Sequence, residues 1–367
     1  MSGKVVVAMS GGVDSSVTAA LLKEQGYEVI GITMQIWPSD KLAEEADRFG
    51  GCCSLAAVDD ARRVAFKLDI PYYVINFREI FAQKVIANFC EEYTRGRTPN
   101  PCIRCNQHIK FDALLKKAKE LNADFIATGH YARIGFDKEK KRYILKKGID
   151  AAKDQSYVLY IMTQEQLAHT LMPLGNLTKT EARRKAAELG LPVAEKPESQ
   201  EICFIPDNDY GKFLKEYIPK VAQSGPILDS RGNLLGEHKG IIFYTIGQRK
   251  GLGISAKEPL YVIAIDRERN AIVVGSEDEV YGSELIAEEV NYISIRQLTR
   301  SIKVKAKIRY KMKEAEAVVT PLNGGKVQVK FTQPQRAITP GQAVVFYQDD
   351  VVVGGGRIVH QVDRRAR

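Results

Sequence analysis

A short segment near the N-terminus constrains the fold more than any other part of the chain. Residues Val5–Ser16 read VVVAMSGGVDSS, an apolar strand, a Ser-Gly-Gly turn and the start of a helix. Glycines let the backbone approach an anion, and a helix N-terminus directs N–H groups and its positive dipole end at it. The hydroxyls of Ser15 and Ser16 add donors, and Asp14 can hold a Mg²⁺ ion that bridges phosphate oxygens. The segment therefore predicts a polyphosphate site.

This segment differs from the common phosphate loop, Gly-x-x-x-x-Gly-Lys-Ser/Thr, because it contains no lysine. The pattern Ser-Gly-Gly-x-Asp-Ser resembles instead the PP-loop of enzymes that split ATP between its α- and β-phosphates to adenylate an acceptor. The alternative interpretation is that the segment has a structural role only, as a tight turn followed by an ordinary helix N-cap. We therefore start from an enzyme that uses ATP, with the acceptor still open.

Size and composition narrow the class of protein. The chain has 367 residues, of which 44% are hydrophobic and 27% charged, as in a soluble globular protein of two or three domains. No apolar run is long enough to span a bilayer, and a first strand at residue 4 or 5 leaves no room for a signal peptide. We therefore expect a cytoplasmic protein. The net charge of +9 favours a polyanionic partner only weakly, because many cytosolic enzymes are basic.

Strand-like and helix-like segments alternate in the first part of the chain, which predicts a doubly wound parallel sheet. Ligands of such sheets bind at the carboxyl ends of strands, where the Ser-Gly-Gly turn falls. Met34, near the end of the second strand, and Gly129, just past the fourth, can flank a nucleotide there. The expected strands are Lys4–Met9, Val29–Trp37, Tyr72–Phe77 and Asp124–Thr128, and the expected helices are Ser15–Gln25, Leu55–Leu68, Ile80–Tyr93 and Lys110–Leu121.

Later segments predict two further domains. The pattern is helical at about 157–190 and extended over Leu191–Ile205, and short strands broken by Gly and Pro follow from Ile241. After about Val290 the chain is typical of an all-β barrel or sandwich. We expect a nucleotide-binding domain over residues 1–210, a small central domain over 211–280 and a β-barrel over 281–367.

A basic segment lies in the last of these domains. In Lys303–Lys313 a cation stands at every second position, so in a strand six cations would share one face. Their spacing of about 6.6 Å is close to that of phosphates along a nucleic-acid strand. A solvated face that blocks edge pairing is the alternative, but such blocking rarely needs more than one or two charges. We therefore favour contact with RNA, in which Arg309 offers phosphate contact and Tyr310 stacking.

The chain has six cysteines, too few for a disulfide scaffold of this length, which favours redox, metal or nucleophilic use. We expect Cys102, Cys105 and Cys203 in loops, the first two held out of helix by neighbouring prolines, with Arg104 able to lower a thiol pKa. Such cysteines suit sulfur transfer, in which one carries a persulfide and another attacks it or resolves it as a disulfide. Three thiolates with an open fourth position equally suit an iron–sulfur cluster. Cys90 lies on an apolar helical face and is assigned to the core, while Cys52 and Cys53 receive no role.

An ordered set of motifs over essentially the whole chain resembles the family of tRNA-specific 2-thiouridylases. The first motif alone occurs in many PP-loop enzymes, whereas the full set is very specific. The motifs are Ser10–Ser16, Gly96–Asn106, Ala127–Arg133, Lys153–Tyr157, Ile202–Ile205, Tyr244–Gly253 and Thr339–Gln342.

The resemblance implies an adenine-nucleotide α-hydrolase-like sheet, a small central domain and a tRNA-binding barrel. It also implies a reaction: ATP, with Mg²⁺, adenylates the C2 oxygen of the wobble uridine in tRNAs for glutamate, glutamine and lysine, and sulfur from a relay protein displaces AMP. Cys203 would carry the persulfide and Cys105 would be the nucleophile that helps release its sulfur. ATP would be bound by Ala8, Met9, Ser10, Gly11, Gly12, Val13, Asp14, Ser15, Met34 and Gly129. Asn100, Pro101 and Cys102 would border the target base, and His130, Lys153, Asp154, Gln155, Arg309, Tyr310 and Gln342 would contact tRNA.

One position departs from the family pattern. The residue at Cys102 is commonly an aspartate there, and a thiol does not replace a carboxylate that is ionised at neutral pH. The change argues against a general base at this position. It strengthens the alternative of a 4Fe–4S cluster held by Cys102, Cys105 and Cys203 whose open iron binds sulfide, although we favour the persulfide relay.

Two further interpretations compete. PP-loop synthetases that form amides share a near-identical loop, but they need an ammonia source and have no use for the cysteines. A non-catalytic module that binds tRNA or senses a nucleotide explains the loop and the basic segment but leaves Cys105 and Cys203 unexplained.

Overall fold

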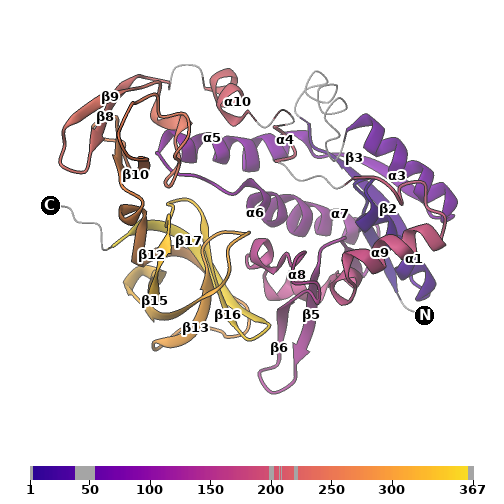
Figure 1. Ribbon diagram of the computed structural model, residues 1–367. Helices are drawn as coiled ribbons and strands as arrows, with labels where there is room; N and C mark the ends of the chain where they lie inside the picture. The colour runs from indigo at the N-terminus through magenta and orange to yellow at the C-terminus, as the bar shows by residue number, and fades with distance from the viewer. Residues whose placement is uncertain are drawn as a thin grey trace. The chain divides into compact units, whose positions relative to one another are not determined.

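The computed structural model describes residues 3–37, 54–197, 202–205, 207, 209–218 and 222–362. The chain forms two compact units, which are described one at a time (Figure 1). The first unit comprises Met1–Ile86, Pro101–Asn208 and Asp350–Val352, and the second comprises Ala87–Asn100, Asp209–Asp349 and Val353–Arg367. A segment from the middle of the N-terminal half therefore belongs with the C-terminal strands. The predicted three-domain boundaries stay a prediction.

The first unit is built on a sheet whose strands are all parallel. In spatial order they are β3 (Tyr72–Asn76), β2 (Glu28–Gln35), β1 (Lys4–Ala8), β4 (Phe125–Ala127) and β7 (Thr170–Leu171). The central strand β1 is a nearly continuous apolar run because helices cover a parallel sheet on both faces, and four of its five residues are buried. The predicted doubly wound parallel sheet is confirmed.

Three helices supply the apolar side chains that cover one face of this sheet. They are α1 (Val13–Glu24), α3 (Leu55–Lys67) and α9 (Lys179–Glu188), which Figure 1 shows gathered near β2. Alternate residues of β1, Val5 and Val7, share one buried cluster with Val17 of α1, Val64 of α3 and Ala186 of α9. Other elements of the unit are α4 (Arg78–Phe81), η1 (Ala82–Ile86), β5 (Ala132–Asp137), β6 (Arg142–Lys147), η3 (Ser156–Leu159), α8 (Gln164–Ala168) and η4 (Pro173–Asn176).

The helix expected over Lys110–Leu121 begins well before that segment. α6 (Pro101–Cys105), η2 (Asn106–Ala113) and α7 (Leu114–Glu120) follow one another without a break. Cys102 and Cys105 therefore lie in a helix, and the prediction of a loop there was wrong. Pro101 is the first helical residue, a position where its missing N–H would have no intrahelical partner and its fixed φ suits the helix. The proline marks where the helix starts.

The second unit contains a small sheet and an aromatic cluster. The sheet has the order β10 (Tyr261–Asp266), β11 (Ala271–Gly275), β8 (Gly225–Asp229) and β9 (Leu234–His238). Helices α5 (Ala87–Thr94) and α10 (Tyr210–Tyr217) meet through aromatic rings: Tyr93 stacks on Tyr210 with centroids 5.5 Å apart, and Phe89 meets Phe213 edge-on at 6.1 Å. Short turns of 3₁₀ helix are η6 (Ile241–Phe243), η7 (Asp278–Val280) and η8 (Asn323–Gly325).

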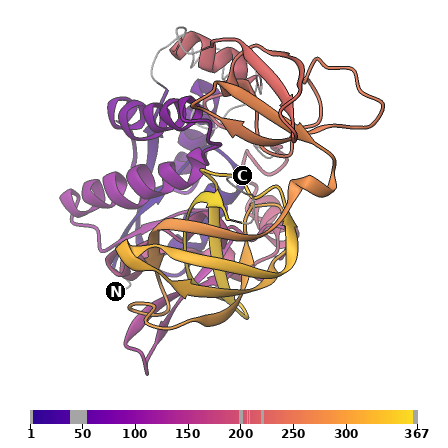
Figure 2. The ribbon, with the colours of Figure 1, turned by 90° about the vertical axis from the view of Figure 1, so that its left-hand side faces the viewer.

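Six strands close into the predicted C-terminal barrel, whose curvature Figure 2 shows in orange and yellow. Inward-facing residues such as Leu285, Val329 and Phe346 are at most 1% exposed and form a continuous core. Pairing between the first and last strands closes the barrel, so neither is left as an edge. The order is β12 (Tyr281–Tyr292), β15 (Val327–Arg336), β14 (Ala315–Pro321), β13 (Ile302–Lys307), β16 (Ala343–Gln348) and β17 (Val351–Gln361).

The basic segment forms a strand over only part of its length. β13 ends at Lys307, so the expected face of six cations over Lys303–Lys313 was wrong. Lys303 and Lys305 are exposed while Val304 and Ala306 are buried, as the alternation predicts, but the chain then turns. Arg309 lies beyond this turn and makes hydrogen bonds within the unit.

No helix of the described part of the chain is long and apolar enough to cross a membrane. Cys52 and Cys53, together with part of the segment expected to be extended over Leu191–Ile205, lie outside the described residues. Cys90 of α5 is buried, which confirms its assignment to the core.

Candidate functional site

The Ser-Gly-Gly turn connects β1 to α1 and is held in shape by its own hydroxyl groups. The backbone N–H of Ser10 donates to Oγ of Ser15 over 3.2 Å, and Oγ of Ser15 lies 3.2 Å from the carbonyl oxygen of Gly12. The hydroxyl of Ser16 donates to the same carbonyl over 2.8 Å. Gly12 is the N-cap of α1 and has no side chain with which to cap the first turn. The end of α1 at the turn is therefore shaped as a seat for an anion.

Two glycines allow the surroundings to close on this turn. Gly11 has φ +68°, and a Cβ there would lie 2.0 Å from the carbonyl oxygen of Ala57 at the start of α3. Gly129 follows β4, and a Cβ there would lie 2.9 Å from both Cβ of Asp14 and the backbone nitrogen of Ser15. Met34, near the end of β2, is buried. The residues expected to bind ATP therefore collect at the carboxyl ends of β1, β2 and β4.

Sequence reasoning missed two lysines that belong to this site. Nζ of Lys179 lies 2.7 and 2.8 Å from the two carboxylate oxygens of Asp14, and the hydroxyl of Tyr131 donates to Oδ1 of Asp14 over 2.7 Å. Nζ of Lys196 donates to the carbonyl oxygen of Gly11 over 3.0 Å and to Asp60 over 2.6 Å. The positive charge that the loop segment lacks therefore comes from residues far along the chain. The sequence predicted a helical pattern around Lys179, but nothing in it indicated that Asp14 is the partner of this lysine.

The Asp14 carboxylate bears on the expected Mg²⁺ site. Magnesium is bound through carboxylate oxygens and waters, and both oxygens of Asp14 accept hydrogen bonds from the ammonium group of Lys179. As arranged, Asp14 does not fit a magnesium ligand, and we derive no step through a metal ion held there.

The cysteines expected to act on sulfur all lie in the first unit. Cys102 is exposed, while Cys105 and Cys203 are half-buried. Phe204, next to Cys203, packs edge-on against Phe81 of α4 at 5.7 Å, which anchors that segment. The described residues, which include all three cysteines, contain no group of three or more His, Cys, Asp or Glu side chains placed for a metal ion. The arrangement therefore does not fit an iron–sulfur cluster on these three sulfur atoms.

Several residues expected to contact tRNA make contacts inside the first unit. His130 is 6% exposed, and its Nδ1 lies 2.8 Å from the hydroxyl of Thr128. Burial, together with the charge of Lys110, holds the pKa of His130 well below its usual value of 6.5, so the ring is neutral. Gln155 accepts the backbone N–H of Tyr131 over 2.9 Å, and Asp154 accepts the N–H of Ser156 over 3.1 Å. Lys153 is half-buried beside them.

The other residues expected to contact tRNA lie in the second unit, as does Asn100, whereas Pro101 begins α6 in the first. The guanidinium group of Arg309 donates to the carbonyl oxygen of Ile246 over 3.1 Å and to the hydroxyl of Thr339 over 2.6 Å. Lys307 lies 5.7 Å from the ring centroid of Tyr310. The side chain of Gln342 donates to the backbone rather than lying open. The tRNA contacts stay a prediction.

Three family models match the chain in succession. The tRNA methyl transferase HUP domain matches residues 3–207, the tRNA methyl transferase PRC-barrel domain residues 211–276, and the aminomethyltransferase β-barrel domain residues 282–358.

Curated relatives match over the full length. A tRNA-specific 2-thiouridylase MnmA of Acetivibrio thermocellus is 61% identical over 97% of this chain and 99% of its own. A tRNA-specific 2-thiouridylase of Thermoanaerobacter is also 61% identical, over 98% and 99% of the two chains. A solved 4-thiouridine synthetase bound to RNA and ATP matches at 18% identity over 59% of this chain and 50% of that chain, with a TM-score of 0.34, too distant to support an argument.

We expect Lys179→Met to weaken ATP binding about tenfold or more, because the substitution removes a cation at the turn and leaves Asp14 with an uncompensated charge. Calorimetric titration with ATP measures the effect. Lys185→Met is the matched control, since Lys185 also lies on α9 and pairs with Glu24 at the far end of α1, with Nζ 3.0 Å from Oε2. Equal reductions in affinity in the two variants, at matched melting temperatures, would contradict a role for Lys179 in binding.

Thiol reactivity should separate Cys102 from Cys90. Burial raises the pKa of Cys90 to about 11, which leaves roughly one thiol in a thousand ionised at pH 8. In the native protein we expect iodoacetamide to alkylate exposed Cys102 and to spare Cys90 until denaturant is added, as followed by peptide mass spectrometry. Labelling of Cys90 at the rate of Cys102 would show that the α5 core opens readily.

Proposed function

We propose that this chain, which belongs to the family of tRNA-specific 2-thiouridylases, replaces the C2 oxygen of a tRNA uridine by sulfur at the expense of ATP. The observation that carries the proposal is 61% identity to enzymes of that name over nearly the whole of both chains. The turn at the N-terminus of α1 would bind ATP for the adenylation step, and the cysteines of the same unit would carry out the sulfur transfer. The chain is then a sulfurtransferase.

The first half of the reaction makes the oxygen a leaving group. A ring carbonyl oxygen departs poorly, so the C2 oxygen of uridine attacks the α-phosphorus of ATP, diphosphate leaves and AMP becomes attached to the base. The N-terminus of α1 and the ammonium groups of Lys179 and Lys196 place positive charge where the triphosphate would lie. We propose that ATP enters with Mg²⁺.

The second half transfers sulfur. The terminal sulfur of a persulfide on Cys203 attacks C2 of the adenylated base, and AMP leaves with the electron pair of the C–O bond. The thiolate of Cys105 then attacks the sulfur of Cys203, which breaks the S–S bond of the former persulfide and leaves 2-thiouridine and a disulfide. Two electrons pass from the two cysteines to the transferred sulfur. A thiol reductant restores both thiols before the next persulfide is loaded.

The proposal extends to the target nucleotide and the sulfur donor. We propose the wobble uridine of tRNAs for glutamate, glutamine and lysine as the target, with a sulfur-relay protein as the persulfide donor. Asn100, Pro101 and Cys102 would border the unstacked base, which an anticodon loop presents at modest cost. Contacts to the tRNA would come from His130, Lys153, Asp154, Gln155, Arg309, Tyr310 and Gln342. The exposed lysines of β13 support a polyanionic partner.

The sulfur chemistry can be tested by removing one cysteine at a time. With tRNA, ATP and a persulfide donor, we expect Cys203→Ala and Cys105→Ala each to lower 2-thiouridine formation at least 100-fold, because in the proposed reaction these two thiols supply the sulfur and the electrons. Cys90→Ala is the control, since its thiol is buried in α5, and it should retain activity. Nucleoside mass spectrometry distinguishes oxygen-to-sulfur exchange from the methylation that two family-model descriptions mention. Methylated product, or full activity without Cys203, would overturn the proposal.

Two other chemistries can be tested directly: an iron–sulfur cluster, which the arrangement of the three sulfur atoms does not fit, and an amide-forming synthetase. Iron and acid-labile sulfide should be measured in protein purified without oxygen. Metal-free protein that is fully active with a persulfide donor supports the relay, whereas activity proportional to bound iron would replace it with the cluster. ATP-dependent consumption of ammonia without thiolation would indicate a synthetase.

The salt dependence of tRNA binding tests the exposed part of β13. We expect the double substitution of Lys303 and Lys305 by glutamine to lower the slope of log K against log salt concentration by about 1 for each phosphate that the strand no longer neutralises. Lys116 and Lys119 on α7, each paired with a carboxylate, provide a control with the same change of charge and should leave the slope unchanged. Equal slopes in all variants would make β13 a solvated face.

A further inference from the structure

Asn106, the residue after Cys105, carries a buried polar atom that is not used within the fold. The side chain is 1% exposed, and its Nδ2 donates to the carbonyl oxygen of Val158 over 3.1 Å. Among the residues that the structure describes, Oδ1 of Asn106 has no hydrogen-bond partner. A buried acceptor without a partner costs stability. The side chain therefore points to a role other than packing.

The helix also changes its geometry at this residue. Cys105 is the last residue of α6, and η2, which begins at Asn106, is a π-helix of eight residues. Turns of π-helix are rare and occur frequently at functional sites. We call residues 101–113 the cysteine helix. Two separate features, the unused acceptor and the π-helix, therefore mark the point that follows Cys105.

The partner of Asn106 belongs to η3, whose four residues are all buried. The N–H of Val158 donates to the carbonyl oxygen of Gln155, the N-cap of η3, over 3.1 Å. The N–H of Gln155 donates to the carbonyl oxygen of Tyr131 over 2.9 Å, and its Oε1 accepts the N–H of Tyr131 over 2.9 Å. These reciprocal bonds fix η3 to the residue just before β5.

Two further residues hold η3 close to Tyr131. A Cβ at Gly148 would lie 2.8 Å from the carbonyl oxygen of Tyr131, so only glycine lets the two backbones approach this closely. Oδ1 of Asp154 accepts the N–H groups of Gly148 and Ser156, each over 3.1 Å. Oδ2 of Asp154 accepts the hydroxyl of Ser156 over 2.8 Å. The start of η3 is therefore held on several sides.

Tyr131 carries the connection on to the proposed ATP site. Its side chain is 3% exposed, and its hydroxyl donates to Oδ1 of Asp14 over 2.7 Å. Asp14 lies in the first turn of α1 and pairs with Lys179. A continuous series of hydrogen bonds thus joins the cysteine helix to this turn, and every residue of it lies within the first unit.

We propose that η3 holds Cys105 at a fixed position relative to the proposed ATP site, and that Asn106 and Tyr131 are positioning residues at the two ends of this connection. The base adenylated at one site must be reached by sulfur whose release depends on Cys105. A misplacement of about 1 Å is enough to slow such a step roughly 100-fold. This inference rests on the proposed function, because its effect on chemistry is an effect on thiolation.

The test removes one end of the connection at a time. Asn106→Leu keeps nearly the same shape and carries no unused acceptor, and Tyr131→Phe lacks only the hydroxyl. Gln164→Leu is the matched control, since Nε2 of Gln164 donates to the carbonyl oxygen of Tyr143 over 3.0 Å and joins α8 to β6 in the same unit. Four quantities are measured: hydrogen exchange of peptides covering residues 155–160, the Kd for tRNA, and the single-turnover rates of diphosphate release and of thiolation with saturating ATP and tRNA.

We expect Asn106→Leu to slow thiolation at least tenfold while diphosphate release and the Kd for tRNA change by less than twofold. Tyr131→Phe should slow thiolation more than diphosphate release, and both variants should speed exchange in η3 at least threefold. The double variant should be no more than twofold slower in thiolation than the slower single variant, because a connection that has lost one end positions nothing through the other. Gln164→Leu should change none of the four.

Several outcomes would overturn the inference. Normal thiolation in Asn106→Leu, or unchanged exchange in both single variants, would show that these residues do not hold η3 and Cys105. Effects that multiply in the double variant would make the two residues independent. Equal slowing of diphosphate release and thiolation would place the effect in adenylation alone. If wild-type protein forms no 2-thiouridine, the proposed function fails, while exchange still tests whether Asn106 and Tyr131 hold η3.

Discussion

The ion pair between Asp14 and Lys179 is the interaction on which the site of the first unit depends. It joins the first turn of α1 to the first turn of α9, two helices that pack on the same sheet. Thr178 caps α9 through a reciprocal hydrogen-bond pair with Glu181, so the helix that carries Lys179 begins at a defined residue. With Tyr131 on the same carboxylate, the pair keeps a cation beside the turn that a phosphate would approach.

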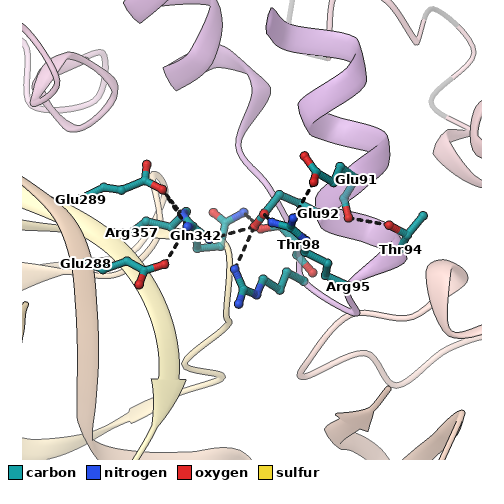
Figure 3. Close-up of polar contacts among 10 residues, drawn as sticks. Glu91, Glu92, Thr94, Arg95, Thr98, Glu288, Glu289, Gln342 and Arg357 are labelled. Atoms are coloured by element: carbon teal, nitrogen blue, oxygen red, sulfur yellow. Dashed lines mark hydrogen bonds and ion pairs between the residues drawn. The ribbon is translucent and has the colours of Figure 1, made fainter. Parts of the chain in front are cut away.

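A comparable constraint organises the second unit. The barrel core is apolar, but the surface that receives α5, Thr98 and Pro99 is made of charges and hydrogen bonds (Figure 3). Such contacts are directional, so they define the position of a bound segment more closely than apolar packing does. The proposed adenylation and sulfur transfer both require groups held within fractions of an ångström. Within the second unit these contacts fix the backbone of Thr98 and Pro99.

The sheet and the barrel could be predicted because their signals are local. Period-2 and buried-strand patterns, with glycine and proline between them, predicted β1 to β4 to within a few residues and predicted that the C-terminal strands form a barrel or sandwich. The predictions of local structure were wrong where a residue type is compatible with two kinds of secondary structure. Pro101 was interpreted as excluding helix although it begins one, and the alternation after Lys307 was interpreted as strand although the chain turns there. In both places the pattern of residue types was compatible with two backbone paths.

For the residues expected at the site, the sequence likewise indicated local features but not the surroundings of each side chain. The loop residues and Gly129 were found because a glycine turn between strand and helix has a local cause, and their meeting follows from the parallel order of β1, β2 and β4. The tRNA contact of His130 stays a prediction; its ring is buried and neutral, because exposure depends on what packs against a residue rather than on its type. The same holds for the amide of Gln342 and the guanidinium of Arg309, whose partners lie in other motifs.

The sequence alone determined the class of fold, the phosphate seat at the end of β1 and, through the ordered motifs, the family. These properties rest on neighbours in the chain, where spacing and residue type carry the information. Only the tertiary structure decided that Lys179 and Lys196 supply the charge that the loop lacks, and that Gln342 bonds to the backbone of Thr98 and Pro99. The physical reason is distance along the chain: Lys179 is 165 residues from Asp14 and Gln342 is 244 from Thr98. Nothing in either local segment indicates the partner that folding brings to it.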